Sequence, residues 1–117
     1  MTVRTNTFTL YAAIVLSAAD QASQSFLLDG FEEAVILINV TAVTGTSPTV
    51  DLDVEVSENG DDWFKRQDVS QITTAGKLDA VPVTNFGKYL RLNNPAALGG
   101  TDTPQFTLTA TLIAKGR

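Results

Sequence analysis

The sequence predicts an all-β protein, an antiparallel β-sandwich of about eight strands with jelly-roll-like or Ig-like connections. Two segments alternate strictly between apolar and polar residues, Gly and Pro turns recur at short intervals, and no sustained helical period lies between those turns. A chain of 117 residues has the usual size of one domain. We therefore expect a single β-sandwich domain over residues 1–117, with a short N-terminal arm of about residues 1–6.

The first two long strands are predicted from apolar runs. Phe8 and Leu10 alternate with threonines before the denser apolar run from Ala12 to Leu16, which predicts an opening strand whose far end is better buried. The run from Ala34 to Val43 is β-branched and apolar at successive positions. Such a run is typical of a strand covered on both faces, so we expect it to lie centrally in a sheet.

The clearest alternation lies in the middle and at the end of the chain. From Thr49 to Ser57, and again from Phe106 to Leu112, every second residue is apolar, which predicts strands with one core face and one polar face. Shorter strands are predicted at Ser25–Leu28, Trp63–Gln67, Leu78–Val83 and Lys88–Leu92. Turn residues such as Asn59-Gly60 separate them.

Two turn segments share an internal echo. Residues 45–52 and 100–108 each combine a Gly-Thr turn, a proline and an alternating strand. Aligning the two segments requires a gap of one residue. Proline is compatible with the first position of a strand, so two turns can reach the same solution independently. We therefore favour shared turn chemistry over an internal duplication.

Composition removes most catalytic and metal chemistry. The chain has no cysteine and no histidine, so thiol nucleophiles, disulfides and imidazole acids, bases or ligands are absent. Its serines have no histidine to activate them, and no glycine-rich phosphate loop follows a strand. We expect a protein that is not an enzyme, with no catalytic residue, no cofactor and no metal site.

Charge and hydropathy bear on the partners. The formal net charge of −5 would repel a phosphate backbone, so we expect no nucleic-acid partner. No stretch approaches the ~20 apolar residues of a membrane-spanning helix, so we expect no membrane partner either. Charged residues make up only 18% of the chain, below the ~25% of an average soluble domain. A surface with so little charge is suited to packing against other proteins.

Two acidic groups suggest calcium, but each has a plainer interpretation. Asp51, Asp53 and Glu55 share one face of a predicted strand at spacings of about 7 Å, in a row rather than around a bend. We interpret them as a solvated face. The acidic residues around Asn59-Gly60 surround a dipeptide that favours a tight hairpin, which we expect there instead of a calcium turn.

The aromatic residues leave two interpretations open. Trp63, Phe64, Phe86 and Tyr89 could line a sugar-binding surface, or they could anchor the core or an interface. We favour the second interpretation because the chain has few aromatic residues. Trp63 precedes Lys65-Arg66, so we expect its ring to pack inward while the two cations reach water.

Partner contacts are expected at the N-terminal arm, at the apolar groups that flank the turn near residue 29, and in the long, weakly charged loop that begins at Asn93. The candidate interface residues are Thr2, Val3, Arg4, Phe26, Leu28, Phe31, Asn94, Pro95 and Leu98.

An ordered series of segments resembles a small structural protein that recurs in tailed bacteriophages. The series comprises Asn39–Val54, Ser57–Trp63, Gln71–Gly76, Gly87–Leu92 and Phe106–Lys115. It covers roughly the last two thirds of the chain. Glu58, where such hairpins often have proline, and the long loop from Asn93 depart from the family pattern. The resemblance implies a β-sandwich that acts as a capsid decoration or cement protein, and it implies no catalytic residue.

The expected function is therefore structural. We expect a virion protein, made in the host cytoplasm, that binds the major capsid protein or other virion subunits and stabilises the assembled phage head. A homo-dimer or homo-trimer is expected. The alternatives are a tail or neck adaptor of the virion and a carbohydrate-binding β-sandwich module.

Overall fold

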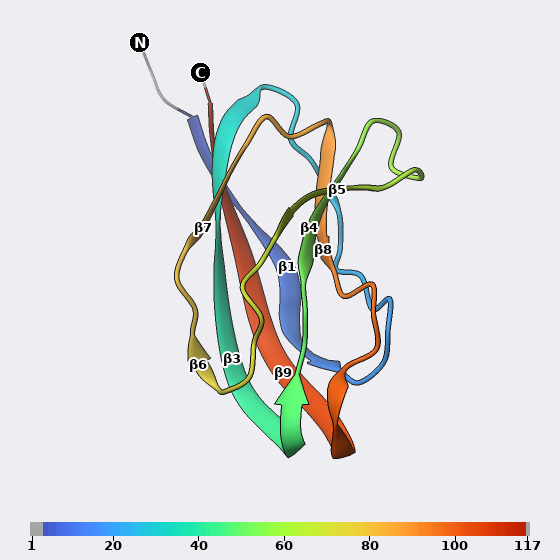
Figure 1. The fold of residues 1–117 in the computed structure, drawn as a ribbon. Helices are drawn as coiled ribbons and strands as arrows, with labels where there is room; N and C mark the ends of the chain where they lie inside the picture. Colours follow the sequence, from blue (N-terminus) through green and yellow to red (C-terminus); the bar gives the residue numbers. More distant parts are fainter. Residues whose placement is uncertain (1–3, 117) are drawn as a thin grey trace.

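The computed structural model describes residues 4–116, which form nine strands in two antiparallel sheets (Figure 1). The strands are β1 (Arg4–Leu16), β2 (Phe26–Leu27), β3 (Phe31–Thr49), β4 (Asp53–Ser57), β5 (Phe64–Asp68), β6 (Gly76–Lys77), β7 (Val81–Thr84), β8 (Tyr89–Asn93) and β9 (Gly99–Gly116). None of the described segments is a helix of the length and apolarity needed to cross a membrane. The predicted all-β sandwich is confirmed.

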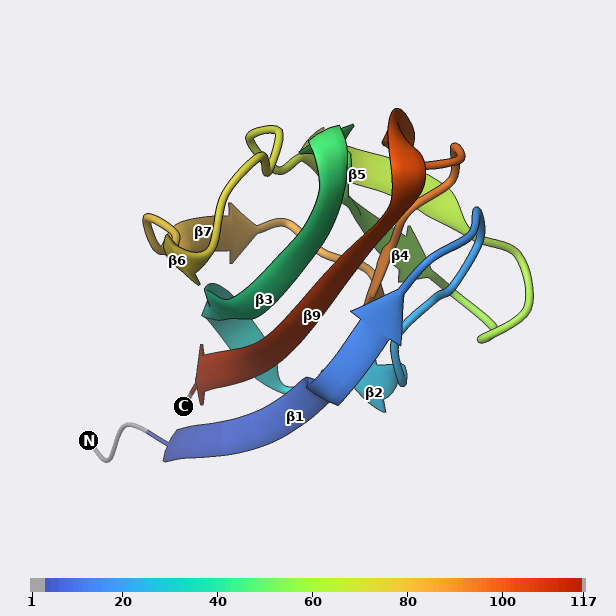
Figure 2. The same cartoon turned by 90° about the horizontal axis from the view of Figure 1, so that it is seen from below.

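The two sheets differ in size and lie face to face (Figure 2). The large sheet has the order β1-β9-β3-β6, with β7 also paired to β3, and the small sheet has the order β2-β8-β4-β5. β3 and β9, with 19 and 18 residues, run alongside each other through the middle of the large sheet. The long β3/β9 pair is therefore the frame on which the other strands are arranged.

The predicted alternation generates the core. Phe106, Leu108 and Leu112 on β9 are fully buried. Val54 on β4 and Leu52, just before β4, are also fully buried and belong to the same core cluster. Burying a side chain of this size stabilises the folded state by about 1.5–3 kcal/mol relative to leaving it exposed. The two segments with the clearest period of two are thus the two that supply the centre of the core.

The prediction for the strand at residues 34–43 is half right. β3 is central in the large sheet, and its inward residues, such as Ile36 and Ile38, are buried. The expected cover on both faces is wrong, because Leu37 on the opposite face is 43% exposed. In a sandwich only one face of each sheet packs against the core. Apolar residues on the other face are then exposed, and such exposed apolar residues are typical of contact sites with other proteins.

Two smaller expectations also need correction. Residues 4–6 do not form an arm, since Arg4 pairs with Gly116 and Asn6 pairs with Ala114 in the register of β1 and β9. The remaining residues of the predicted arm, 1–3, lie outside the described residues. The short strand β6 at Gly76–Lys77, which pairs with Asn39 and Val40, was not among the strands expected from the sequence.

A bulge in β1 explains why the opening strand alternates imperfectly. The register with β9 shifts between Thr9 and Tyr11 and again between Tyr11 and Ile14, and Ala13 has a φ of 50°. The Ala13 amide donates to Thr109 Oγ1 at 3.1 Å. A bulge leaves backbone groups outside the ladder, so this side-chain acceptor replaces a missing ladder bond.

The echoed turn segments pair with each other at the far end of the β3/β9 pair. Thr46 lies opposite Thr101 and hydrogen-bonds the Asp102 carboxylate. Gly45 and Gly100 have φ values of 101° and 103°, a backbone conformation that favours glycine. We call residues 44–49 and 99–105 the ribbon tip. The two similar segments thus lie side by side in the sheet, and each has a glycine with positive φ at its turn.

The ribbon tip yields a matched pair of glycine variants. Gly100→Ala would place a Cβ 2.8 Å from two backbone carbonyl oxygens, those of Thr46 and Ser47, while a Cβ at Gly76 meets nothing within 4 Å. Both variants strain φ, so the packing conflict is the difference between them. We expect Gly100→Ala to be less stable than Gly76→Ala by about 1–3 kcal/mol in urea unfolding. Equal losses of stability would contradict this packing.

Candidate interaction surfaces

The outward face of the large sheet carries a run of threonine and aliphatic side chains on β1, β3 and β9. We call it the outer face; its members are Thr7, Thr9, Val15, Val35, Leu37, Asn39, Thr107, Thr109, Thr111 and Ile113. The residues that alternate with these on β3 and β9 point into the core. The charged pair at one end, Glu33 and Lys115, lies in cross-strand register. A second cation borders the face at its β6 side, where Lys77 lies in register with Asn39.

Apolar side chains on the outer face are unusually exposed. Val15 and Leu37 are each 43% exposed, and Val35 lies opposite Ile113 across the strand pair. A depression of about 200 Å³ lies over this end of the face, lined by Val35, Ile113 and Pro82 among others. An aliphatic patch surrounded by threonines is easily desolvated, which is the property expected of a protein contact.

The second candidate surface is the free edge of β1. β9 is the one described strand that pairs with β1, and the register is regular from Arg4 to Thr9. Under this edge Phe8 contacts Phe26 and Phe31, with ring centroids 4.9 and 6.2 Å apart. The Arg4 guanidinium lies 4.5 Å from the centroid of the Phe31 ring. We call Phe8, Phe26 and Phe31 the aromatic cluster.

The structure places the first group of predicted interface residues in different environments. Leu28 is 2% exposed and belongs to the core, so its prediction as a contact residue is wrong. Phe26 and Phe31 are half-buried against the core, and Arg4 is exposed. Leu27, one of the apolar groups that flank this turn, is 49% exposed. Thr2 and Val3 lie outside the described residues.

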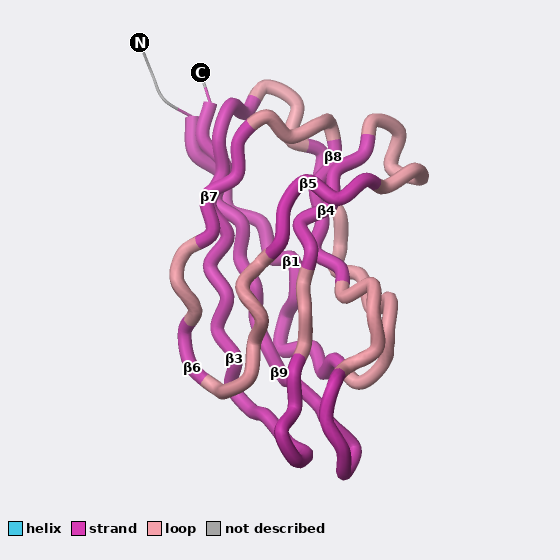
Figure 3. Tube along the Cα trace, in the orientation of Figure 1, coloured by secondary structure: helices cyan, strands magenta, loops and turns pink. Residues whose placement is uncertain are grey.

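Asn94 is a structural clamp, so its prediction as an interface residue is also wrong. It is fully buried; its Oδ1 accepts from the Gln21 amide at 2.9 Å and its Nδ2 donates to the Ala18 carbonyl at 2.6 Å. These bonds hold the loop after β1 beside the loop after β8 (Figure 3). Pro95 is exposed, and Leu98 is half-buried against the core.

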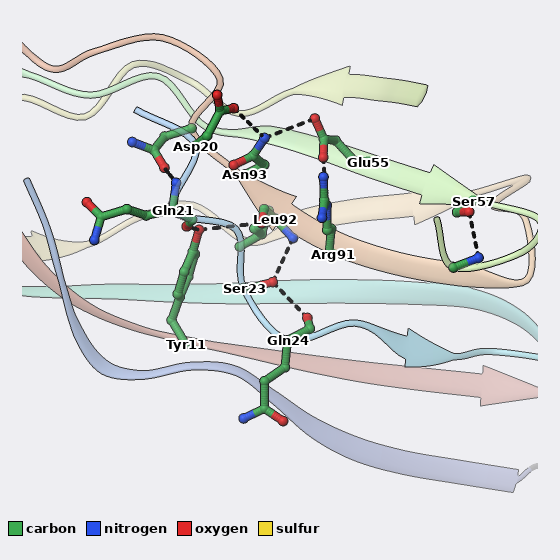
Figure 4. Close-up of polar contacts among 12 residues, drawn as sticks. Tyr11, Asp20, Gln21, Ser23, Gln24, Glu55, Ser57, Arg91, Leu92 and Asn93 are labelled. Atoms are coloured by element: carbon green, nitrogen blue, oxygen red, sulfur yellow. Dashed lines mark hydrogen bonds and ion pairs between the residues drawn. The ribbon is translucent and has the colours of Figure 1, made fainter. Parts of the chain in front are cut away.

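A polar cluster crosses the outer side of the small sheet (Figure 4). Arg91 Nε donates to Glu55 Oε1 at 2.8 Å, and Asn93 Nδ2 lies 3.3 Å from both Glu55 Oε2 and Asp20 Oδ1. The Arg91 guanidinium also lies 4.2 Å from the Trp63 ring centroid. Glu55 is only 9% exposed, so the predicted solvated acidic face is wrong at this position.

Tyr11 anchors the loop after β1 from inside the core. Its hydroxyl donates to the Gln21 carbonyl at 2.6 Å, and the Leu92 carbonyl lies 3.4 Å away (Figure 4). Burial raises the pKa of the Tyr11 hydroxyl far above its ordinary value, with Arg91 opposing and Glu55 reinforcing the shift. The hydroxyl therefore stays protonated at neutral pH and serves as a fixed donor.

The connection between β4 and β5 spans residues 58–63, so it is longer than the tight hairpin expected there, although Gly60 has a positive φ of 83°. Ser57 Oγ accepts from the Gly60 amide at 2.8 Å, and Asn59 Oδ1 accepts from the Asp61 and Asp62 amides at 2.9 Å each. Within residues 4–116, no three carboxylates gather into a group that could hold a metal ion.

The aromatic residues near this hairpin do not share one environment. Trp63 is half-buried, but its ring packs against Arg91 on the outer side of the small sheet, so the expected inward packing is wrong. Phe86 packs against the core, and Tyr89 is half-buried. Phe64 is 67% exposed, at the rim of a hollow of about 480 Å³ lined by the acidic hairpin. All four aromatic residues were expected in the core or in an interface. Of these four, Phe64 is the one that the fold leaves largely exposed to solvent.

Comparisons with known proteins support the fold. No family model matches the chain, and no curated protein matches it. Among solved structures, the crystal structure of SPBc2 prophage-derived protein YomS is similar, with a TM-score of 0.59 and 11% sequence identity. The match covers 99% of this chain and 96% of that chain. At this identity the likeness concerns the fold, and the resemblance to a tailed-phage family remains a prediction.

The Asn94 clamp can be tested directly. Asn94→Ala would leave the Gln21 amide and the Ala18 carbonyl without their partners. We expect a loss of about 2–4 kcal/mol in the free energy of unfolding, measured by urea denaturation. The exposed neighbour provides the control, since Pro95→Ala should change stability by less than about 0.5 kcal/mol. Similar values for the two variants would argue against the clamp.

Asp53 predicts a dependence of stability on pH. Burial raises the pKa of its carboxyl, the neighbouring Asp68 adds to the shift and Lys65 opposes it. A raised carboxyl pKa means that the charged form destabilises the folded state, so stability falls as pH rises through that pKa. Asp53→Asn should therefore be more stable than the parent at pH 7, and the gain should vanish below the ordinary pKa of aspartate.

The control for this prediction is Asp79→Asn, which changes the net charge equally at an exposed position. Thermal unfolding of both variants across the acidic range isolates the local effect from that of overall charge. A gain for Asp53→Asn that is constant with pH would contradict the assignment.

Proposed function

We propose that the chain is a virion structural protein of a tailed phage, a capsid decoration or cement subunit that binds the assembled shell of the major capsid protein. The observation that carries this proposal is the outer face, an uncharged surface of aliphatic and threonine side chains spread over three long strands. The fold it shares with a prophage-derived protein is consistent with a phage origin. The resemblance of the ordered sequence segments to a tailed-phage family points the same way.

The proposed mechanism is mass action. A subunit that binds the assembled shell better than its separated components adds its binding free energy to the energy needed to open the shell. A β-sheet surface is suited to this role because backbone pairing between β3 and β9 fixes the relative positions of its side chains. Val35, Leu37 and Ile113 would supply the apolar centre of the contact, and the surrounding threonines would supply a rim that can hydrogen-bond.

Two other functions lead to different observations. A tail or neck adaptor would use the same surface at a few copies per virion, so copy number separates it from a decoration protein. A carbohydrate-binding module is favoured only by Phe64, whose ring is 67% exposed beside a hollow that carries carboxylate and amide groups. Glycan binding that Phe64→Ala abolishes in a folded protein would support that module.

The outer face can be tested by placing one charge in its centre. Leu37→Glu and Thr111→Glu should each fold, because both side chains point away from the core, but each would bury a carboxylate in the contact. We expect at least a tenfold loss of occupancy on purified virions, about 1.4 kcal/mol of binding free energy. Quantitative mass spectrometry of particles complemented with each variant measures this occupancy.

Thr73→Glu is the matched control, since it adds the same charge in an exposed loop away from the outer face. It should be incorporated like the parent. Normal incorporation of Leu37→Glu and Thr111→Glu, or absence of the parent chain from purified virions, would overturn the proposal.

A further inference from the structure

We propose that two copies of this chain pair through the free edge of β1, antiparallel and about a two-fold axis at Thr7, so that their large sheets join into one continuous sheet. The pairing segment is Thr5–Thr9, which is the regular part of β1 before its first register shift. We call this segment the β1 edge.

The β1 edge lacks the features that usually protect a sheet edge. Natural edge strands are shortened, bulged, covered or given a proline or an inward-facing charge. The bulge at Ala13 and the loop that bonds to Leu10 protect only the later part of β1. From Thr5 to Thr9 there is no proline and no charged residue, and β9 is the one described strand paired to this segment. Alternate amides and carbonyls there face outward without a strand partner.

Symmetry makes a second copy a fitting partner. A two-fold axis perpendicular to the sheet keeps inward residues inward, so an antiparallel pair must match residues of the same parity. With the axis at Thr7, Thr5 lies opposite Thr9 of the second copy and Thr7 lies opposite Thr7. The outward row of the junction then consists of threonine pairs, which stabilise antiparallel sheets.

Few charged residues lie at the proposed junction between the two acidic chains. The chain has a net charge of −5, but Arg4 is the sole charged residue of β1. In the proposed register Arg4 lies opposite Leu10 of the second copy, and the two Arg4 residues are separated by about 20 Å along the strands. Screening at physiological salt makes their mutual repulsion small at that distance.

The aromatic cluster explains what the pairing would bury. Phe8 and Phe26 are half-buried at the open side of the sandwich, next to Leu27, which is 49% exposed. With the axis at Thr7, Phe8 would meet Asn6 of the second copy, and the two aromatic clusters would shield each other. Apolar burial would thus add to the new ladder of backbone hydrogen bonds.

One consequence of this dimer rests on the proposed function. Because the axis is perpendicular to the sheet, both outer faces point the same way. A dimer would therefore present a surface of twice the width to a capsid shell, and each copy would be held by the contacts of the other. The pairing itself belongs to the isolated chain, so its test in solution can fail or succeed apart from any virion experiment.

The absence of cysteine makes a symmetric cross-link a sharp test. In Thr7→Cys the two sulfurs would meet across the axis, at a Cα separation compatible with a disulfide. We expect mild oxidation to convert most of this variant to a dimer of twice the 12.5 kDa chain mass. The matched control, Thr73→Cys in an exposed loop, should remain largely monomeric.

Charge exchange at the same position tests the pairing without a covalent bond. Thr7→Lys alone and Thr7→Glu alone should each raise the dimer dissociation constant by about tenfold, because like charges would face each other at the axis. A mixture of the two variants should recover dimer in analytical ultracentrifugation, since opposite charges then meet. A parent chain that is monomeric up to millimolar concentration, or a mixture that recovers no dimer, would overturn the proposal and leave the edge free for a strand of another protein.

Discussion

The pairing of β3 with β9 is the constraint on which the rest of the molecule depends. From Glu33 to Val40 of β3 the two strands keep one register, so in this part their inward residues form a row of buried side chains and their outward residues form the outer face. The two faces of a strand are coupled, because a slip of one residue would exchange them. Core formation by Ile36 and Ile38 and the exposure of Leu37 are therefore two results of one register.

The loops complete the sandwich through hydrogen bonds that link distant parts of the chain. Asn94 holds the loop after β1 through its side chain, and the Tyr11 hydroxyl meets the same loop from the core. On the small sheet, Arg91 neutralises Glu55 and covers Trp63 at the same time. Buried polar groups of this kind specify one arrangement of loops, because leaving any one of them unpaired is costly.

The sequence predicted what local periodicity determines. Strict alternation identified Leu52, Val54, Phe106 and Leu108 as core, and all four are fully buried. It failed where the answer depends on residues far away in the chain. The hydrogen-bond partners of the buried Asn94 side chain lie more than 70 positions earlier in the chain. The residues next to Asn94 in the sequence therefore do not distinguish it from a solvated loop asparagine. The exposure of Leu37 could not be predicted for a related reason. An apolar residue on the second face of a strand suggests that this face is covered, but the local sequence does not show which segment, if any, covers it.

Arg4 and Gly116 are neighbours in the β1/β9 register, so the two ends of the described chain lie next to each other. Both ends of the described chain leave from one pole, while the ribbon tip lies at the opposite pole of a body 52 Å long (Figure 1). A domain fused to either terminus would therefore project from the same pole and leave the ribbon tip unobstructed. The same adjacency would let a short peptide linker join the two ends into a circular permutant.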